Sequence, residues 1–101
     1  MTFDHFNQKN LERKLQSYGP LDNWSYTDWA CAAAGEMGET CNLIKKLRRG
    51  EEIQIEEVTN EIADVVIYLD LLCSRFGESL GEAIQRKFNI VSKRIGSEVT
   101  L

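Results

Sequence analysis

The sequence is poor in several features that mark other classes of protein. It has one proline and one histidine, and its three cysteines, Cys31, Cys41 and Cys73, form no C-x-x-C pair. Neither a zinc site nor a disulfide framework is therefore indicated, and we expect the cysteines to be buried as small hydrophobic residues. No hydrophobic run approaches the roughly eighteen residues of a membrane span, and the first residues lack a signal-peptide pattern. We therefore expect a cytoplasmic protein that does not enter a membrane.

An excess of basic residues is also missing. Twelve Lys and Arg stand against 16 Asp and Glu, for a net charge of -4. Because non-specific binding to a nucleic-acid polymer needs a large basic surface, we expect no such partner. A length of 101 residues with 43% hydrophobic residues indicates one small globular domain over residues 1–101.

Four segments have helical periodicity, and each is followed by a glycine that can end a helix. These glycines are Gly19, Gly50, Gly77 and Gly96. The predicted helices cover residues 2–18, Ser25 or Thr27 to 49, 55–76 and 79–96, with a loop over 21–26. The last begins with the capping-box pattern Ser79-Leu-Gly-Glu82. No strand pattern competes, so the predicted fold class is all-α.

The third segment has the clearest hydrophobic stripe. Seven residues follow one another at spacings of three and four: Ile55, Val58, Ile62, Val65, Leu69, Leu72 and Phe76. This spacing is typical of a helix packed in a bundle. The stripe exceeds what one thin bundle needs, so we predict burial against a second chain, with the pocket near that contact.

Two acidic pairs lie in the second and third segments. Glu36 and Glu39 are three residues apart, as are Glu61 and Asp64, so each pair shares one helical face. No Lys or Arg follows one turn later to neutralise them, and such like charges cost about 0.2 to 0.5 kcal/mol per pair, so a cation is expected. The turn from Gly50 is short, which predicts antiparallel helices with all four carboxylates converging.

Carboxylates without a convergent histidine are hard oxygen ligands that suit Mg2+, with Mn2+ as a substitute. We therefore take Glu36, Glu39, Glu61 and Asp64 as candidate metal ligands. The alternative is a solvated acidic face of an ordinary bundle, and a di-iron bundle would need a Glu-x-x-His motif that is absent. Gly35 and Gly38 bracket the first pair, either to admit a neighbouring helix, a metal or a phosphate, or for simple packing through small residues.

The acidic motifs resemble those of a known family. Gly35-Glu-Met-Gly-Glu39 and Glu61-Ile-Ala-Asp-Val-Val-Ile-Tyr68 resemble the MazG-like nucleoside triphosphate pyrophosphohydrolases, and the resemblance covers residues 29–96. It implies a four-to-five-helix bundle of the MazG-like type, assembled as a homodimer or as a dimer of dimers. It also implies Mg2+-dependent hydrolysis of (deoxy)nucleoside triphosphates to the monophosphate and pyrophosphate, a housecleaning activity on the nucleotide pool. Gly35 departs from the family, which commonly has a glutamate there.

With a metal held by the four acids, one carboxylate can also serve as the general base. Glu36 and Glu39 are the candidates, and the choice between them stays open. Lys87 and Arg94 match basic positions of the family's last helix and share a face, so we expect them to contact phosphate. Lys46, in the basic cluster that ends the second segment, is a further candidate, although such residues usually serve only the helix dipole.

Recognition of the base needs an aromatic platform. Tyr68 is the best-placed candidate because it stands four residues after Asp64, on the same helical face. Trp24, Tyr26 and Trp29 are also candidates, and the tryptophans alternatively serve as core or subunit contacts. Further candidates to reach the nucleotide lie in the first segment: Asn7, Asn10 and Arg13.

Two other functions stay open. One is a non-catalytic helical protein that binds nucleotides or regulates a partner, which Gly35 favours because it breaks the family's motif. The other is a phosphoribosyl-ATP pyrophosphohydrolase, which fits less well because the residues after Asp64 are closer to the MazG-like pattern. Neither the base nor the sugar of the substrate follows from the sequence.

Overall fold

The computed structural model describes all 101 residues and contains helices only. Its elements are α1 (Phe3–Tyr18), a short 3₁₀ turn η1 (Leu21–Asn23), α2 (Tyr26–Arg48), α3 (Ile55–Arg75) and α4 (Leu80–Ile95). The all-α prediction is confirmed, and each predicted end of a helix lies within one residue of the observed one. None of these helices combines the length and the apolar character that crossing a membrane requires.

Short-range hydrogen bonds and glycines with positive φ fix the ends of the helices. Ser25 begins α2 with a capping box: the Asp28 backbone N–H donates to its hydroxyl at 3.1 Å, and its own N–H donates to the Asp28 carboxylate at 2.9 Å. At the start of α4, the Ser79 hydroxyl accepts from the Glu82 N–H at 3.3 Å. Gly96 ends α4 at φ 72°, a left-handed conformation that strains residues with a Cβ.

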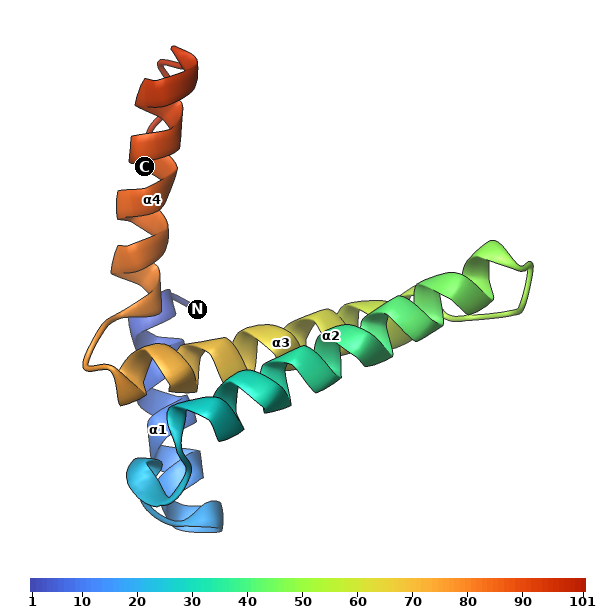
Figure 1. Cartoon of the computed structure of the whole chain (residues 1–101), viewed down its shortest axis with the longest axis horizontal. Coiled ribbons are helices and arrows are strands. Elements are labelled where there is room, and N and C mark those ends of the chain that lie inside the picture. Colours follow the sequence, from blue (N-terminus) through green and yellow to red (C-terminus); the bar gives the residue numbers. More distant parts are fainter.

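A long antiparallel hairpin of α2 and α3 forms the main body of the molecule (Figure 1). The two helices are joined by residues 49–54. Trp29 and Ala33 of α2 and Val58 of α3 are buried, and Leu71 of α3 is the remaining buried hydrophobic residue. Such a small apolar core is a consequence of the elongated shape, which leaves few places where three helices meet.

α1 crosses the C-terminal part of α3 and is attached to it by polar contacts (Figure 1). Asp70 of α3 is only 1% exposed, and its carboxylate accepts hydrogen bonds from the side-chain amides of Asn7 and Asn10 at 2.9 to 3.2 Å. Asn7 also donates to the Ser74 hydroxyl at 2.8 Å, and Asn10 to the Ile67 carbonyl at 3.1 Å. These bonds fix the position of α1 on α3.

α4 projects away from the hairpin and gives the chain the shape of an L (Figure 1). It meets α1 near its start, where a Cβ added to Gly81 would lie 2.9 Å from the Cβ of Phe3. The C-terminal tail folds back along α4: Gln85 and Asn89 donate to the Leu101 backbone oxygen at 3.1 and 3.0 Å. In a single chain, therefore, α3 contacts each of the other three helices, and most of α4 stands apart from them.

The expectation that the cysteines are buried is wrong in this chain. Cys31 and Cys41 are exposed because α2 packs against α3 and no other helix, and Cys73 of α3 is only partly buried. Of the two explanations left open for Gly35 and Gly38, packing through small residues is not seen within this chain, since a Cβ added to either glycine would have no atom within 4 Å. The space beside both glycines is open.

Candidate active site

The two acidic motifs meet across the hairpin. α2 presents Glu36, and α3 presents Glu61 and, one turn later, Asp64. One oxygen of each of the three carboxylates lies within 4.8 Å of the other two, and all three side chains are half-buried. The structure thus brings together three of the four predicted ligands, because the short connection makes α2 and α3 antiparallel neighbours.

Glu39, the fourth predicted ligand, is exposed and lies outside this group. It follows Glu36 by three residues on α2, so it stands on the adjoining part of the surface. Its negative charge is near enough to raise the pKa of Glu36. Its roles as ligand and general base stay predictions.

The electrostatics of the acidic group favour a cation. The pKa of Glu36 is raised from its ordinary value of 4.5, chiefly because the facing Glu61 carboxylate favours a proton on Glu36 as a hydrogen-bond donor. Partial burial and the negative charges of Asp64, Glu61 and Glu39 raise that pKa further. In addition, the Oε2 atom of Glu61 is buried without a hydrogen-bond partner. A divalent cation would satisfy this oxygen and relieve the repulsion, and carboxylate oxygens are ligands that hard divalent cations take.

An open cavity of about 580 Å³ lies beside the carboxylates. Its walls come from α1, the following loop, α2 and α3: Asn10, Arg13, Lys14, Tyr18, Trp24, Trp29, Glu36, Asp64, Ile67, Tyr68 and Leu71. This volume is typical of sites for small molecules. Because Glu36 and Asp64 belong to both the acidic group and the wall, a ligand in the cavity can reach a cation held by the carboxylates.

Three aromatic rings gather at this cavity. The ring centres of Trp24 and Trp29 are 4.6 Å apart, and Tyr68 lies 6.5 Å from Trp24 and 6.2 Å from Trp29. Trp29 is only 2% exposed whereas Trp24 is 38% exposed, so Trp29 supports the other two from the core. A planar ligand can therefore contact Trp24 and Tyr68. Tyr26 lies elsewhere, stacked on Phe76 with ring centres 4.2 Å apart.

Two basic residues of α1 line the cavity. The Lys14 ammonium donates hydrogen bonds of 2.9 to 3.2 Å to four oxygens, those of the Tyr18, Gly19 and Pro20 carbonyls and of the Asn23 side chain. Lys14 therefore holds the corner between α1 and η1 while adding positive charge to the wall. Arg13 is exposed and forms neither an ion pair nor a side-chain hydrogen bond, so its guanidinium group is free to bind an anion.

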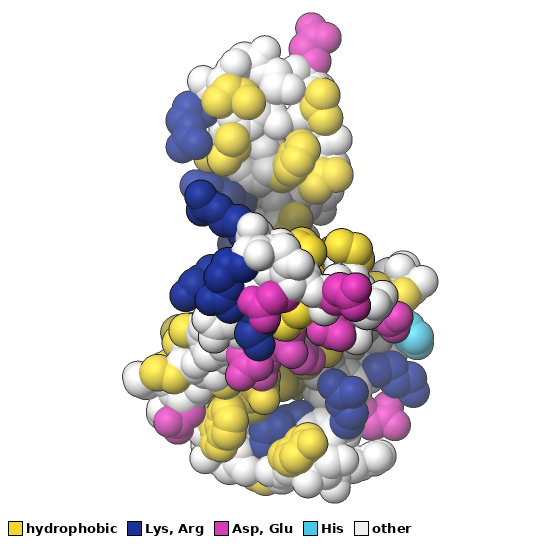
Figure 2. Space-filling view, turned by 90° about the vertical axis from the view of Figure 1, so that its right-hand side faces the viewer, with side chains coloured by type: hydrophobic (Ala, Val, Ile, Leu, Met, Phe, Trp, Pro, Cys, Tyr) yellow, Lys and Arg dark blue, Asp and Glu magenta, His cyan; other side chains and the backbone are white.

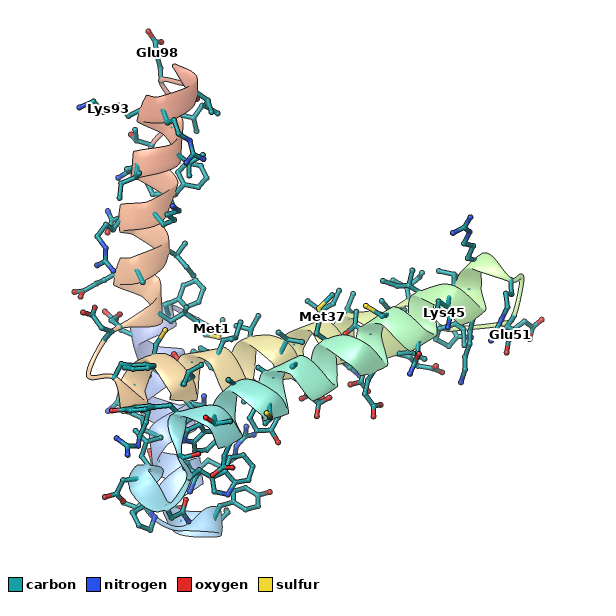
Figure 3. The ribbon with its side chains drawn as sticks, viewed as in Figure 1. Met1, Met37, Lys45, Glu51, Lys93 and Glu98 are labelled. Carbon is teal, nitrogen blue, oxygen red and sulfur yellow. The ribbon has the colours of Figure 1, made fainter.

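The other predicted substrate contacts do not line this cavity. Lys46 is exposed in the last turn of α2, and Figure 3 shows its neighbour Lys45 near the tip of the hairpin. Lys87 borders an apolar groove on α4, and Arg94 is exposed in the last turn of α4. Within one chain these cations do not meet the acidic group, and their contact with substrate stays a prediction. Asn7, a weaker candidate, bonds to Asp70 instead.

Sequence reasoning missed Lys14 and Tyr18 at the cavity, as well as the buried Asp70. A signal for Lys14 exists: Asn7, Asn10 and Lys14 follow one another at spacings of three and four, as inward-facing helical residues do. Polar residues in such a pattern normally form a solvated face of a helix, so the pattern alone does not predict that Lys14 is buried. In α1 the buried residues are Asn10 and Lys14.

Comparisons of this chain with protein-family models, with curated proteins and with solved structures give no match. Its function is therefore inferred from the residues that meet at the acidic group and the cavity.

Proposed function

We propose that this chain is a Mg2+-dependent nucleoside triphosphate pyrophosphohydrolase, which cleaves (deoxy)nucleoside triphosphates into the monophosphate and pyrophosphate. The observation that carries the proposal is a group of three carboxylates, two of which, Glu36 and Asp64, line the wall of an aromatic-lined cavity. The resemblance of the two acidic motifs to MazG-like enzymes suggests the reaction. We propose further that the protein clears surplus or non-canonical nucleotides in the cytoplasm, as a homodimer or homotetramer.

In this proposal Glu36, Glu61 and Asp64 hold the metal, which is Mg2+ or, as a substitute, Mn2+. Once bound, the ion would neutralise part of the triphosphate charge and activate a water molecule. Glu36 and Glu39 are the candidate bases for that water: Glu36 because its pKa is raised, and Glu39 because it stands next to the group and is open to solvent.

The remaining walls of the cavity suit the other parts of a nucleotide. The exposed ring of Trp24 and the half-buried ring of Tyr68 both line the cavity and offer aromatic surface on which a base can stack. Arg13 is a free cation for the phosphates, and the charge of Lys14 adds to its field. With the base near the rings, the phosphates can extend toward Glu36 and Asp64 on the same wall.

The test is to incubate the purified protein with each nucleoside and deoxynucleoside triphosphate and Mg2+, and to separate the products by anion exchange. We expect monophosphate and pyrophosphate. Glu61→Gln keeps the shape of the side chain but removes its charge, and should lower kcat by about 100-fold or more. The matched control is Glu56→Gln, the same change in an exposed first-turn residue of α3, which should leave kcat unaltered.

Other outcomes separate the alternatives. Orthophosphate as the product, or turnover that survives Glu61→Gln, would overturn the proposal. Nucleotide binding without turnover of any substrate would favour the regulatory protein. If phosphoribosyl-ATP is added as a further substrate and is the one compound hydrolysed, the protein is instead a phosphoribosyl-ATP pyrophosphohydrolase.

A further inference from the structure

The wall of the cavity contains a polar side chain whose orientation is fixed. Asn10 of α1 lines the cavity and is only 4% exposed. Its side-chain nitrogen Nδ2 donates to the Ile67 carbonyl at 3.1 Å and to the Asp70 carboxylate at 2.9 Å, which uses both N–H groups of the amide. A carbonyl and a carboxylate accept hydrogen bonds and do not donate them. The opposite orientation of the amide would set oxygen against oxygen, so these two partners lock it.

The lock leaves the other end of the amide, the oxygen Oδ1 of Asn10, without a donor. Oδ1 accepts no hydrogen bond within the chain, and the buried side-chain atoms that lack a partner are others, Glu61 Oε2 and Arg75 Nε. The oxygen is therefore open, and the cavity is the space that Asn10 borders. A ligand in the cavity thus meets an acceptor whose direction is set before binding, which reduces the entropy cost of the contact.

Asn10 lies at the end of the cavity away from the carboxylates. Asp64, Tyr68 and Leu71 follow one another along one face of α3, and all three line the cavity. The rise from Asp64 to Leu71 is about 10 Å, comparable to the length of a nucleoside with its first phosphate. Asn10 bonds to Asp70, next to Leu71. Phosphates held near Asp64 would therefore place the base beside Asn10.

The surface changes in the same direction. Figure 2 shows acidic side chains over the hairpin and, below them, hydrophobic side chains at the bottom of the molecule, where α1 ends. Buried donors at this end are already engaged. The Lys14 ammonium has three N–H groups and faces four oxygens of the α1–η1 corner, and the Trp29 indole N–H donates to the Leu21 carbonyl at 3.4 Å. This end of the cavity therefore offers a fixed acceptor, whereas the keto oxygens of uracil or thymine meet no free buried donor.

We propose that Asn10 reads the base of the bound nucleotide, with its Oδ1 accepting a hydrogen bond from an exocyclic amino group. Adenine, cytosine or guanine is then preferred to uracil and thymine. An amino group projects from the ring, so it can reach this acceptor while the ring stacks on Trp24 and Tyr68. Asp70 does not touch the nucleotide and acts by holding the amide. This inference rests on the proposed function for the presence of a nucleotide, and it adds the class of base.

The first test uses the unmodified protein and measures binding with Ca2+ in place of Mg2+, so that turnover is not required. Isothermal titration calorimetry gives Kd for three matched pairs of triphosphates, each in the ribose and the deoxyribose form. The pairs are adenosine with purine riboside, cytidine with 2-pyrimidinone riboside, and guanosine with inosine. The second member of each pair lacks the amino group.

For the base that binds best, we expect removal of the amino group to weaken binding by about 10-fold or more, because Oδ1 of Asn10 is then left unpaired beneath the base. The triphosphates of uracil and thymine should bind as weakly as the amino-free analogues. Equal binding within all three pairs would overturn the inference, and so would tightest binding of a uracil or thymine nucleotide.

The second test uses Asn10→Leu, which keeps about the same size and removes the acceptor. The 10-fold difference within the preferred pair should disappear. The matched control is Asn7→Leu, the same change one turn earlier on α1, where the amide also bonds to Asp70 but does not line the cavity. Both variants lose an attachment of α1, so a purely structural role would affect both alike. Asn7→Leu should keep the difference, and an equal effect of the two substitutions would count against base reading by Asn10.

Failure of this inference can be told apart from failure of the proposed function. Hydrolysis to monophosphate and pyrophosphate, with equal binding within every pair, would retain the function and reject the role of Asn10. A preference for amino-bearing bases without hydrolysis in Mg2+ would retain the role of Asn10 and reject the function.

Discussion

α1 and α4 have the same length, 16 residues, but their inner faces are of opposite kinds. The buried residues of α1 are Asn10 and Lys14, and α1 is attached to its own chain through hydrogen bonds, including those to Asp70. α4 contacts the other helices near its start, and its Ile84 and Phe88 are 37% and 41% exposed. α1, which lines the cavity, thus buries polar side chains, whereas α4 leaves apolar side chains exposed. α1 thus completes the cavity of its own chain, whereas the apolar face of α4 stays uncovered within that chain.

The polar attachment of α1 is most strongly tested by Asp70→Ala. This change leaves the buried amide of Asn10 and the partly buried amide of Asn7 without their acceptor. We expect the free energy of unfolding to fall by about 3 kcal/mol. Urea unfolding at one fixed protein concentration measures it, with the exposed Asp22→Ala as control. A loss no greater than that of Asp22→Ala would show that α1 is held by something else.

Lys14→Met tests the second polar contact of α1. The side chain keeps its apolar length but no longer donates to the oxygens of the α1–η1 corner, so stability should fall by about 2 kcal/mol. Lys9→Met is the control, since Lys9 forms only an exposed ion pair with Glu12 at 3.3 Å. If both variants unfold at the same urea concentration, the buried ammonium contributes no more than a surface pair.

The pH dependence of stability measures the charge repulsion within the acidic group of Glu36, Glu61 and Asp64. The pKa of Glu36 is raised from 4.5 in the folded chain, so just above pH 4.5 the folded state keeps a proton that the unfolded state has released. Metal-free stability should therefore fall as the pH rises through this window. In EDTA, the Tm of Glu36→Gln minus the Tm of the wild type should increase as the pH rises. A constant difference between them would argue against repulsion at Glu36.

The smallest expected effects come from two glycines. Gly35→Ala should stabilise the chain by about 0.5 to 1 kcal/mol, because its Cβ meets no atom within 4 Å and alanine favours a helix. Gly81→Ala should instead destabilise it by about 1 kcal/mol, because its Cβ would lie 2.9 Å from that of Phe3, where α1 meets α4. Thermal unfolding of both variants measures the difference. Equal Tm shifts would mean that the contact between α1 and α4 is loose.

Much of the fold and part of the site could be predicted from the sequence, because local chemistry sets them. Caps such as Ser25 and terminal glycines such as Gly96 define helix ends wherever they occur. The spacing of Glu36, Glu61 and Asp64, with a short turn between the helices, was enough to place these carboxylates together.

The rest depends on contacts between distant residues. From the sequence alone, Asp70 would be expected at the surface. It is buried because the side-chain amide of Asn10, which lies 60 positions earlier in the chain, donates a hydrogen bond to its carboxylate. The direction of α4 has no local signal either, and the exposure of Cys41 follows from a hairpin face that no helix of the same chain covers. A hydrophobic pattern shows that a face is apolar, but it does not show which chain packs on it.

The most direct test of the metal site is a crystal structure of the protein grown with Mn2+ and measured at a wavelength where manganese scatters anomalously. We expect an anomalous peak between the carboxylates of Glu36, Glu61 and Asp64, beside the cavity. This expectation is contradicted if these three side chains carry no peak while Mn2+ is present in excess.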